Sequence, residues 1–411
     1  MSPTIAKPPR PAAPPLLGWL WLLWALCLLP ITALARSDDE LARAGLDALV
    51  RLDYAQSQQV LDTLEQQNAD YPLLSFLRAS ILWVKAEAQQ GEGKNRIPAW
   101  VEASQAYNAA IKQAETHLKA EPGNPGWHLA LGMSQFFIAR TYVEQGKVFK
   151  VYHYARTGRD TLRALIVEHP DIYDAYFALG IYEYIAGSIP RGVNWLAVLF
   201  DISGDRHLGV QYLQLAIARA PVMAPEAARM LLAAAALQPE YVDNPCQYLP
   251  LSRQTHDRYP QNPHFSGAYQ MLHANCGYPE QALAENERAR QVYLEQFPDM
   301  EKILDIIKVQ TLSSMGDLEG VQAMRDRFQK KNPAYWYLAM AQAYDTLDRR
   351  VEARKYYYTI RDSGDEGKPN VLANSDNKDW VLDQVDRYLR TPYTKPERAA
   401  YDPTNPFMLT P

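Results

Sequence analysis

The segment PAYWYLAMAQAYDTLDRRVEARKYY, residues 333–357, decides the fold class. Its apolar residues recur at helical spacing and alternate between large and small side chains: Tyr337, Met340, Ala341, Tyr344, Ala353 and Tyr357. Small residues at such positions let two helices approach closely, while aromatic rings fill the space between successive helix pairs. The segment therefore predicts a helical hairpin that packs against further hairpins.

Prolines divide the rest of the chain into similar units. Each one closes a stretch of helical periodicity, where proline stops a helix and starts a short turn: Pro72, Pro122, Pro170, Pro221, Pro260, Pro298 and Pro333. Their spacings are 50, 48, 51, 39, 38 and 35 residues. We predict hairpins at about 38–70, 73–120, 126–169, 172–220, 223–259, 263–297, 300–331 and 334–361, followed by a capping helix at about 377–391.

The spacing and the size pattern together resemble tetratricopeptide (TPR) repeats, whose period is about 34 residues. Weaker copies of the pattern occur in two other units: Tyr176, Leu179 and Gly180, and Trp127, Leu131 and Gly132. Gly277 and Gly316 are expected to supply left-handed turns between paired helices, and Leu52-Asp53-Tyr54 is the same turn without glycine. The prediction is an all-α, right-handed TPR-like α-solenoid of about eight hairpins over 36–391, with an extended, mobile proline-rich tail at 392–411.

The first 35 residues have the order of a secretory signal peptide. Two basic residues, Lys7 and Arg10, precede the apolar run LLGWLWLLWALCLL at 16–29, and Ala33-Leu34-Ala35 fits a cleavage site. The favoured prediction is therefore a periplasmic protein after cleavage. The alternative is an uncleaved helix that anchors the chain in the inner membrane.

Export and charge limit the classes of partner and the state of the cysteines. The net charge of −5 offers no basic face for a nucleic acid. Without residues 1–35 only Cys246 and Cys276 remain. In an oxidising compartment, and at facing ends of antiparallel helices, they are expected to form a disulfide. The alternative is two separate buried thiols.

One stretch, GSIPRGVNWLAVLFDISGDR at 187–206, interrupts the repeat where a TPR hairpin has a short turn. Three elements, LGIYEY at 179–184, IP at 189–190 and GDRxxG at 204–209, resemble a TPR subfamily of bacterial envelope proteins. They are also similar to the eukaryotic inclusion-body-clearance TPR family. The resemblance covers roughly residues 130–220 and implies the fold. Association with lipid bodies or protein inclusions is implied for the eukaryotic relatives only.

The insert and the neighbouring helices are the candidate binding region. Aligning the Leu-Gly pairs places several apolar residues toward one groove: Phe136, Phe137, Phe177, Ile181 and Tyr184. The insert adds Trp195, Phe200 and Arg206. Three interpretations stay open: the insert plugs the groove, the groove takes an apolar peptide segment, or Trp195–Phe200 contacts a membrane surface.

No catalytic, metal-binding or cofactor-binding motif stands out. The eight histidines form no H-E-x-x-H or zinc spacing, and no G-x-S-x-G occurs. Glu183 is expected to be partly buried and paired with Arg191 or Arg206, with Arg206 forming an ion pair inside the insert. The first hypothesis is a non-catalytic scaffold that binds a protein or peptide in the envelope. The second is a small-ligand-binding accessory protein or an enzyme, with a pocket under residues 187–206.

Overall fold

A computed structural model describes residues 36–88, 97–188, 203–238, 242–365, 367–373, 375, 377–399 and 408–409. Residues Asp38–Pro411 form one compact unit, and Met1–Ser37 form another, of which only residues 36 and 37 are described. The predicted signal peptide therefore lies outside the described residues, as do Trp195 and Phe200 of the insert.

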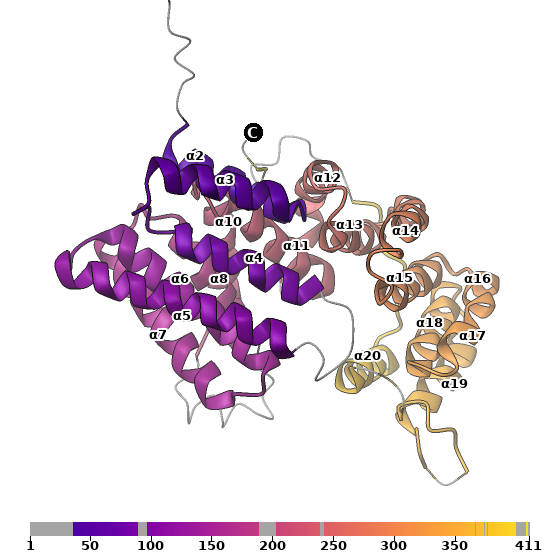
Figure 1. Cartoon of the computed structure of the whole chain (residues 1–411). Helices are drawn as coiled ribbons and strands as arrows, with labels where there is room; N and C mark the ends of the chain where they lie inside the picture. Colours follow the sequence, from indigo (N-terminus) through magenta and orange to yellow (C-terminus); the bar gives the residue numbers. More distant parts are fainter. Residues whose placement is uncertain are drawn as a thin grey trace, which may run out of the picture. The chain divides into compact units, whose positions relative to one another are not determined.

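The described residues contain eighteen α-helices, one 3-10 helix and no strand, so the predicted all-α class is confirmed (Figure 1). The helices are α2 (Asp38–Val50), α3 (Tyr54–Gln67), α4 (Leu74–Ala88), α5 (Ile97–Ala120), α6 (Pro125–Glu144), α7 (Val148–Glu168), α8 (Asp174–Gly187), α10 (Arg206–Arg219), α11 (Ala224–Leu237), η4 (Pro245–Tyr248), α12 (Leu249–Arg258), α13 (Pro263–Asn275), α14 (Pro279–Tyr293), α15 (Met300–Met315), α16 (Leu318–Ala323), α17 (Arg325–Phe328), α18 (Pro333–Thr346), α19 (Arg350–Arg361) and α20 (Lys378–Arg390). Among these helices, none is long and apolar enough to cross a membrane.

Consecutive helices pack as pairs that match the predicted hairpins. The pairs in contact are α2 with α3, α4 with α5, α6 with α7, α8 with α10, α11 with α12, α13 with α14, α15 with α16, and α18 with α19. The predicted capping helix is α20, which packs on α18 and α19. In the hairpin predicted at about 300–331, the part after α15 is divided at Met324 into two short helices, α16 and α17.

The turns use the residues that their geometry requires. Gly277 and Gly316 have φ values of 80° and 74°, which confirms their predicted left-handed conformation. Leu52 takes the same role with φ 63°, and Asp53 accepts the amide of Gln56 to begin α3. Proline in the first turn, where no helical N–H partner is needed, starts α6, α11, α13, α14 and α18.

Two neighbouring pairs share one packing device. A Cβ atom on Gly158 of α7 would lie 2.7 Å from the backbone nitrogen of Phe136 on α6. A Cβ atom on Gly209 of α10 would lie 2.6 Å from the backbone nitrogen of Tyr184 on α8. In both pairs the missing side chain lets the second helix touch the backbone of the first. This repetition supports the inference, made from the Leu-Gly pattern, that the two pairs are copies of one unit.

The first helix contacts a part of the chain far away in the sequence. The hydroxyl of Tyr259 donates to Asp47 at 2.6 Å, and the Asn262 side-chain amide donates to the carbonyl of Val50 at 2.7 Å. Helix α11 packs on α2 as well as on α8, α10, α12 and α13. In a simple solenoid each repeat contacts only its neighbours. Here the N-terminal pairs instead close on α11 and the α12–α13 turn, which the sequence analysis did not anticipate.

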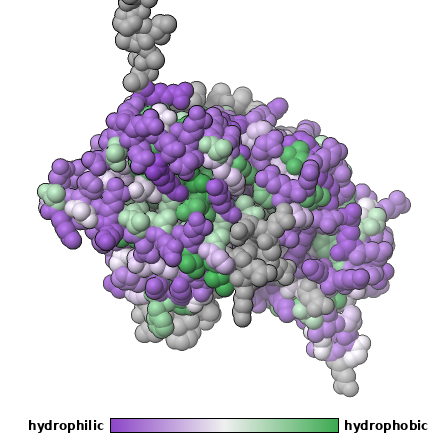
Figure 2. All heavy atoms as spheres, viewed as in Figure 1, coloured by the Kyte–Doolittle hydropathy of each residue, from purple (hydrophilic) through white to green (hydrophobic). Residues whose placement is uncertain are grey.

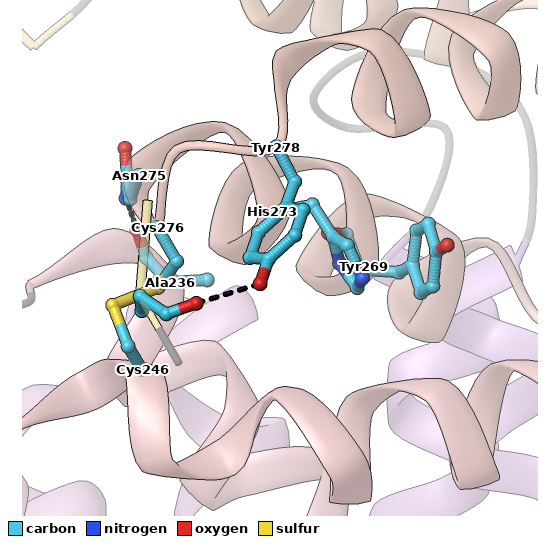
Figure 3. The surroundings of a disulfide bond; sticks show 8 residues. Ala236, Cys246, Tyr269, His273, Asn275, Cys276 and Tyr278 are labelled. Carbon is cyan, nitrogen blue, oxygen red and sulfur yellow. Dashed lines mark hydrogen bonds between the residues drawn. A yellow bond between two sulfur atoms is a disulfide. The ribbon is translucent and has the colours of Figure 1, made fainter. Parts of the chain in front are cut away.

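The predicted Cys246–Cys276 disulfide is present and joins η4 to the end of α13, across a sequence separation of 30 residues (Figure 3). The chain beyond α20 returns to this place. The amide of Ala399 donates to the carbonyl of Cys276, and the Tyr278 hydroxyl donates to the carbonyl of Ala399. Leu409 is buried, its backbone amide donates to the side-chain oxygen of Gln254, and its carbonyl accepts from the side-chain nitrogen of the same residue. The described residues of the predicted tail are thus extended but held against the helices.

Candidate functional site

An apolar pocket lies between α4, α6, α7, α8 and α11, with a volume of about 490 Å³. Most of the lining comes from α6, α7 and α8, with Trp83 and Glu87 from α4 and Arg229 and Met230 from α11. The volume falls within the range of about 300–1,000 Å³ found for ligand pockets. Four of the predicted groove residues line it: Phe136, Phe137, Phe177 and Ile181.

Two other predicted binding residues, Tyr184 and Arg206, do not line the pocket. The hydroxyl of Tyr184 donates to Gln238 at 2.8 Å. Arg206 is the first residue of α10 and does not line the pocket. The interpretation that the insert plugs the groove rests on Trp195 and Phe200, which lie outside the described residues. The structure thus brings four of the eight predicted residues together in one pocket, and their role in binding stays a prediction.

Phe137 is the centre of the inner wall. Its ring lies 5.3 Å from that of Phe76, 6.2 Å from that of Trp83 and 5.9 Å from that of Phe177, between ring centroids. These separations are typical of edge-to-face and tilted aromatic pairs, which add to the stability gained by burial. Because the rings come from α4, α6 and α8, the wall is a fixed surface that three helix pairs support together.

The outer edge of the pocket is formed by exposed apolar side chains. Val143 is 50% exposed, Val148 70%, Phe149 82% and Ile185 57%. All four line the pocket. A single exposed apolar side chain is common on protein surfaces, but a group of them beside a concave surface is typical of an interaction site. The sequence signal was the apolar pair Val148-Phe149 directly after the Gly146 turn, which the sequence analysis overlooked.

The wall formed by the end of α6 and by α7 carries a positive charge. Residues 140–163 contain six basic and two acidic residues, in a chain whose net charge is −5. The basic residues are Arg140, Lys147, Lys150, Arg156, Arg159 and Arg163, and the acidic ones are Glu144 and Asp160. Arg140 pairs with Glu144, and Arg156 donates to the hydroxyl of Tyr152 at 2.8 Å. Arg156 also pairs with Asp160 at 3.7 Å. The pocket lining itself contains Arg140, Arg156 and Arg229 against one carboxylate, that of Glu87, so its charge favours negatively charged groups.

A smaller pocket of about 200 Å³ adjoins the apolar one, since Trp83, Glu87 and Arg229 line both. It contains a charged group of side chains from three helices. Arg229 pairs with Glu226 at 2.8 Å on α11, and the Nε2 atom of His264 on α13 lies 4.0 Å from Glu87 on α4. The charged residues therefore mark the inner end of the crevice, while its outer end is apolar.

Glu183 is buried at 3% exposure beside the pocket helices, as the sequence analysis expected. Its predicted partners were Arg191 and Arg206, but the ion pair that the structure describes joins it to Arg163 of α7. Its second oxygen accepts the amide of Asp205 at 3.0 Å, and Asp205 in turn caps α10. The missed partner lies one helix back in the chain, where sequence spacing alone gave no reason to place it. Arg191 lies outside the described residues.

The Gly-Asp-Arg element at 204–206 thus has a structural role. Gly204 leaves room for Ala186, because a Cβ atom there would lie 2.6 Å from the side chain of Ala186. A Cβ atom on Gly187 would lie 2.7 Å from the amide nitrogen of Arg206. The two ends of the insert therefore leave and rejoin the helix pair at the same place, next to Ile185 and Ala186 of the pocket.

Burial of Tyr182, a further pocket residue, raises the pKa of its hydroxyl, although Arg159 donates to it at 2.7 Å and opposes the shift. Within the described ranges, no group of three His, Cys, Asp or Glu side chains is placed to hold a metal ion. The pocket therefore offers apolar surface and basic groups.

No protein-family model matches the chain, and no curated protein matches it.

Proposed function

We propose that this chain is an exported, non-catalytic scaffold that binds a polypeptide partner in the cell envelope through the apolar pocket. The pocket edge formed by Val143, Val148, Phe149 and Ile185 carries this proposal. A small apolar ligand needs an enclosed pocket, whereas exposed apolar residues around the opening suit a large partner that covers them.

The scaffold is a right-handed TPR-like α-solenoid in this proposal. Stacked helix pairs, the proline spacing and the shared glycine contacts of α6–α7 and α8–α10 support it. The N-terminal sequence and the Cys246–Cys276 disulfide support an oxidising compartment, the periplasm after signal cleavage. An anchor formed by uncleaved residues 1–35 would hold the same scaffold at the inner membrane.

The chemistry of the pocket indicates the kind of partner. Apolar side chains entering the pocket would be buried against Phe137 and Phe177, and basic residues surround them on α6 and α7. The partner segment is therefore apolar and flanked by acidic side chains, as in an amphipathic helix that lays one face into a groove. Its acidic residues would face Arg140 and Arg156.

Site-specific photo-crosslinking in intact cells tests the proposal. A photoreactive phenylalanine analogue replaces Phe149 in one strain and Val351 in another. Val351 of α19 is 70% exposed and lies outside the pocket, so it reports random encounters. We expect a discrete polypeptide adduct at position 149 that is absent at position 351. Its crosslinked peptide should be apolar with acidic flanks.

A matched pair of double variants provides the control for affinity. Val148→Ser with Phe149→Ser should remove the adduct formed by a probe at Ile185. Val167→Ser with Val351→Ser, at positions 81% and 70% exposed, should leave it unchanged. Equal adducts at positions 149 and 351 would refute a binding pocket here. An adduct only to a small, solvent-extractable molecule would favour the alternative, a small-ligand-binding accessory protein.

A further inference from the structure

A second concave site shares no lining residue with the apolar pocket. It has a volume of about 140 Å³ between α11, α13, α15, α18, α20 and Tyr393. Its lining is rich in side-chain amides and hydroxyls: Asn275, Gln310, Thr311, Ser314, Gln342 and Gln384. No acidic residue of the described chain lines it. The site therefore offers neutral donors and acceptors on a concave surface.

Some of these polar groups have no hydrogen-bond partner among the residues that the structure describes. Thr311 and Ser314 donate to backbone carbonyls of α15, and Gln342 accepts from Ser313. By contrast, neither side-chain amide of Gln310 or Gln384 has a hydrogen-bond partner among the described residues. Two carboxamides on facing helices thus remain available to a ligand.

Helix α20 adds an aromatic and a cationic group to the same site. Trp380 stacks on Tyr335 of α18 with 5.8 Å between ring centroids, and its side chain also lines the groove. The guanidinium of Arg387 lies over the ring of Tyr388 and has no carboxylate partner in the described part of the chain. Both groups therefore face the space between α20 and the inner helices.

The wall that α20 forms is held in place by its own contacts. Val381 and Val385 are fully buried. Arg350 of α19 donates to the carbonyls of Tyr388 and Leu389, which satisfies the end of the helix. Trp380 and Gln384 are thus presented from a fixed helix, as a preorganised site requires.

We propose that this groove, lined by Gln310, Gln384 and Trp380, binds a glycan. A sugar ring carries hydroxyl groups that both donate and accept, which matches carboxamides, and an apolar C–H face that matches an indole ring. The volume is smaller than that of a typical ligand pocket, so it suits one unit of a longer chain. A carboxylate on that unit would reach Arg387, so uronic-acid glycans bind more tightly than neutral ones.

An array of neutral and uronic-acid hexasaccharides, probed with the purified protein, tests this inference. Binding to the array is expected, with a lower half-saturation concentration for the uronic-acid members. The Gln310→Ala/Gln384→Ala double variant should raise that concentration about tenfold, since each amide contributes a net hydrogen bond. Gln322→Ala on α16, an exposed residue outside the groove, should leave it unchanged.

Further variants assign the roles of the remaining groups. Arg387→Gln should remove the preference for uronic acids and keep the binding of neutral hexasaccharides. The midpoint of thermal unfolding of each variant should match that of the wild type, because the side-chain amides of Gln310 and Gln384 form no hydrogen bond with other described residues.

Absence of binding to every hexasaccharide, or equal binding by the double variant, overturns the inference. Binding of a Gly-Ser hexapeptide in place of the sugars, with the same dependence on Gln310 and Gln384, overturns the ligand class. The apolar pocket is not involved, so these outcomes leave the proposed polypeptide binding unaffected.

Discussion

The two ends of the chain use the same helix pairs but bury different inner surfaces. From α2 to α13 the apolar residues form one continuous core, and the alanine-rich helix α11 contributes nine of its fourteen residues to the buried interior. From α15 to α20 a separate core forms, and the surface facing inward carries amides and hydroxyls. Small apolar residues on the inner helices allow the N-terminal pairs to close on α11.

A polar seam separates the two cores. In the described part of the chain, Ala289, Tyr293 and Leu304 of α14 and α15 form a small cluster of their own that belongs to neither core. Around it, Arg290 and Arg327 both pair with Asp305, and Glu285 pairs with Arg288 and His256. Ion pairs contribute less to cohesion than a shared apolar core. We therefore expect the two regions to unfold as distinct units, so that a substitution can destabilise one region without the other.

The largest effect is expected from Asp345→Ala in the C-terminal core. The Asp345 side chain is fully buried and accepts from Arg350, from the Tyr357 hydroxyl at 3.0 Å and from the amide of Tyr393 at 3.0 Å. Removing it leaves Arg350 without its charge partner, which typically destabilises by about 3–5 kcal/mol. Urea unfolding should show this loss in the C-terminal transition alone. Asp326→Ala, at an exposed position of α17, should shift either transition by less than about 0.5 kcal/mol.

Removal of the disulfide should destabilise the other region, the N-terminal core. Replacing Cys246 and Cys276 by Ser releases a loop with a sequence separation of 30 residues, and loop-closure entropy sets the loss of stability at about 3–4 kcal/mol. The N-terminal transition should shift, because Cys276 belongs to that core. The same urea titration measures it. An unchanged N-terminal midpoint would show that the bridge does not constrain this region.

Acid should also weaken the N-terminal core through His273. Burial lowers the pKa of His273 to about 4, against an ordinary 6.5, and the nearby His256 and Arg253 add to the shift. Between these pH values the unfolded chain binds the proton and the folded chain does not, so stability falls as pH falls from 6.5 to 4. The loss reaches up to about 3 kcal/mol.

The difference between wild type and His273→Gln across this pH range isolates the effect. Buried Asp174, whose pKa burial raises to about 6, contributes equally to both proteins. The variant should lose less stability on acidification, whereas His153→Gln, an exposed change on α7, should follow the wild-type curve. Parallel curves for wild type and His273→Gln would contradict the assignment.

The smallest effect on stability is expected from alanine substitutions at two helical glycines, Gly158 and Gly267. Gly158→Ala forces a methyl group against the backbone of α6, which should destabilise the N-terminal core by about 1–3 kcal/mol. Gly267→Ala on α13 meets nothing within 4 Å and should stabilise by up to about 1 kcal/mol through helix propensity. Midpoints that move in the same direction would show that the α6–α7 contact is not tight.

The sequence predicted what depends on local chemistry. Prolines and left-handed glycines located the helix pairs, the cysteine pair located the disulfide, and the Leu-Gly register located Phe136, Phe137, Phe177 and Ile181. Contacts between distant segments could not be predicted in this way. The pairing of Tyr259 with Asp47, of Glu183 with Arg163 and of Leu409 with Gln254 depends on how successive pairs rotate. That rotation accumulates from small differences in packing, which a helical pattern does not contain.

Hydrogen exchange with mass spectrometry on wild type and Asp345→Ala tests the division into two regions most directly. If the two regions unfold independently, exchange in α18, α19 and α20 becomes faster in the variant, while exchange in α6, α8 and α11 keeps its wild-type rate. A uniform increase across both sets of helices would contradict it, because one cooperative core would then extend through the whole array.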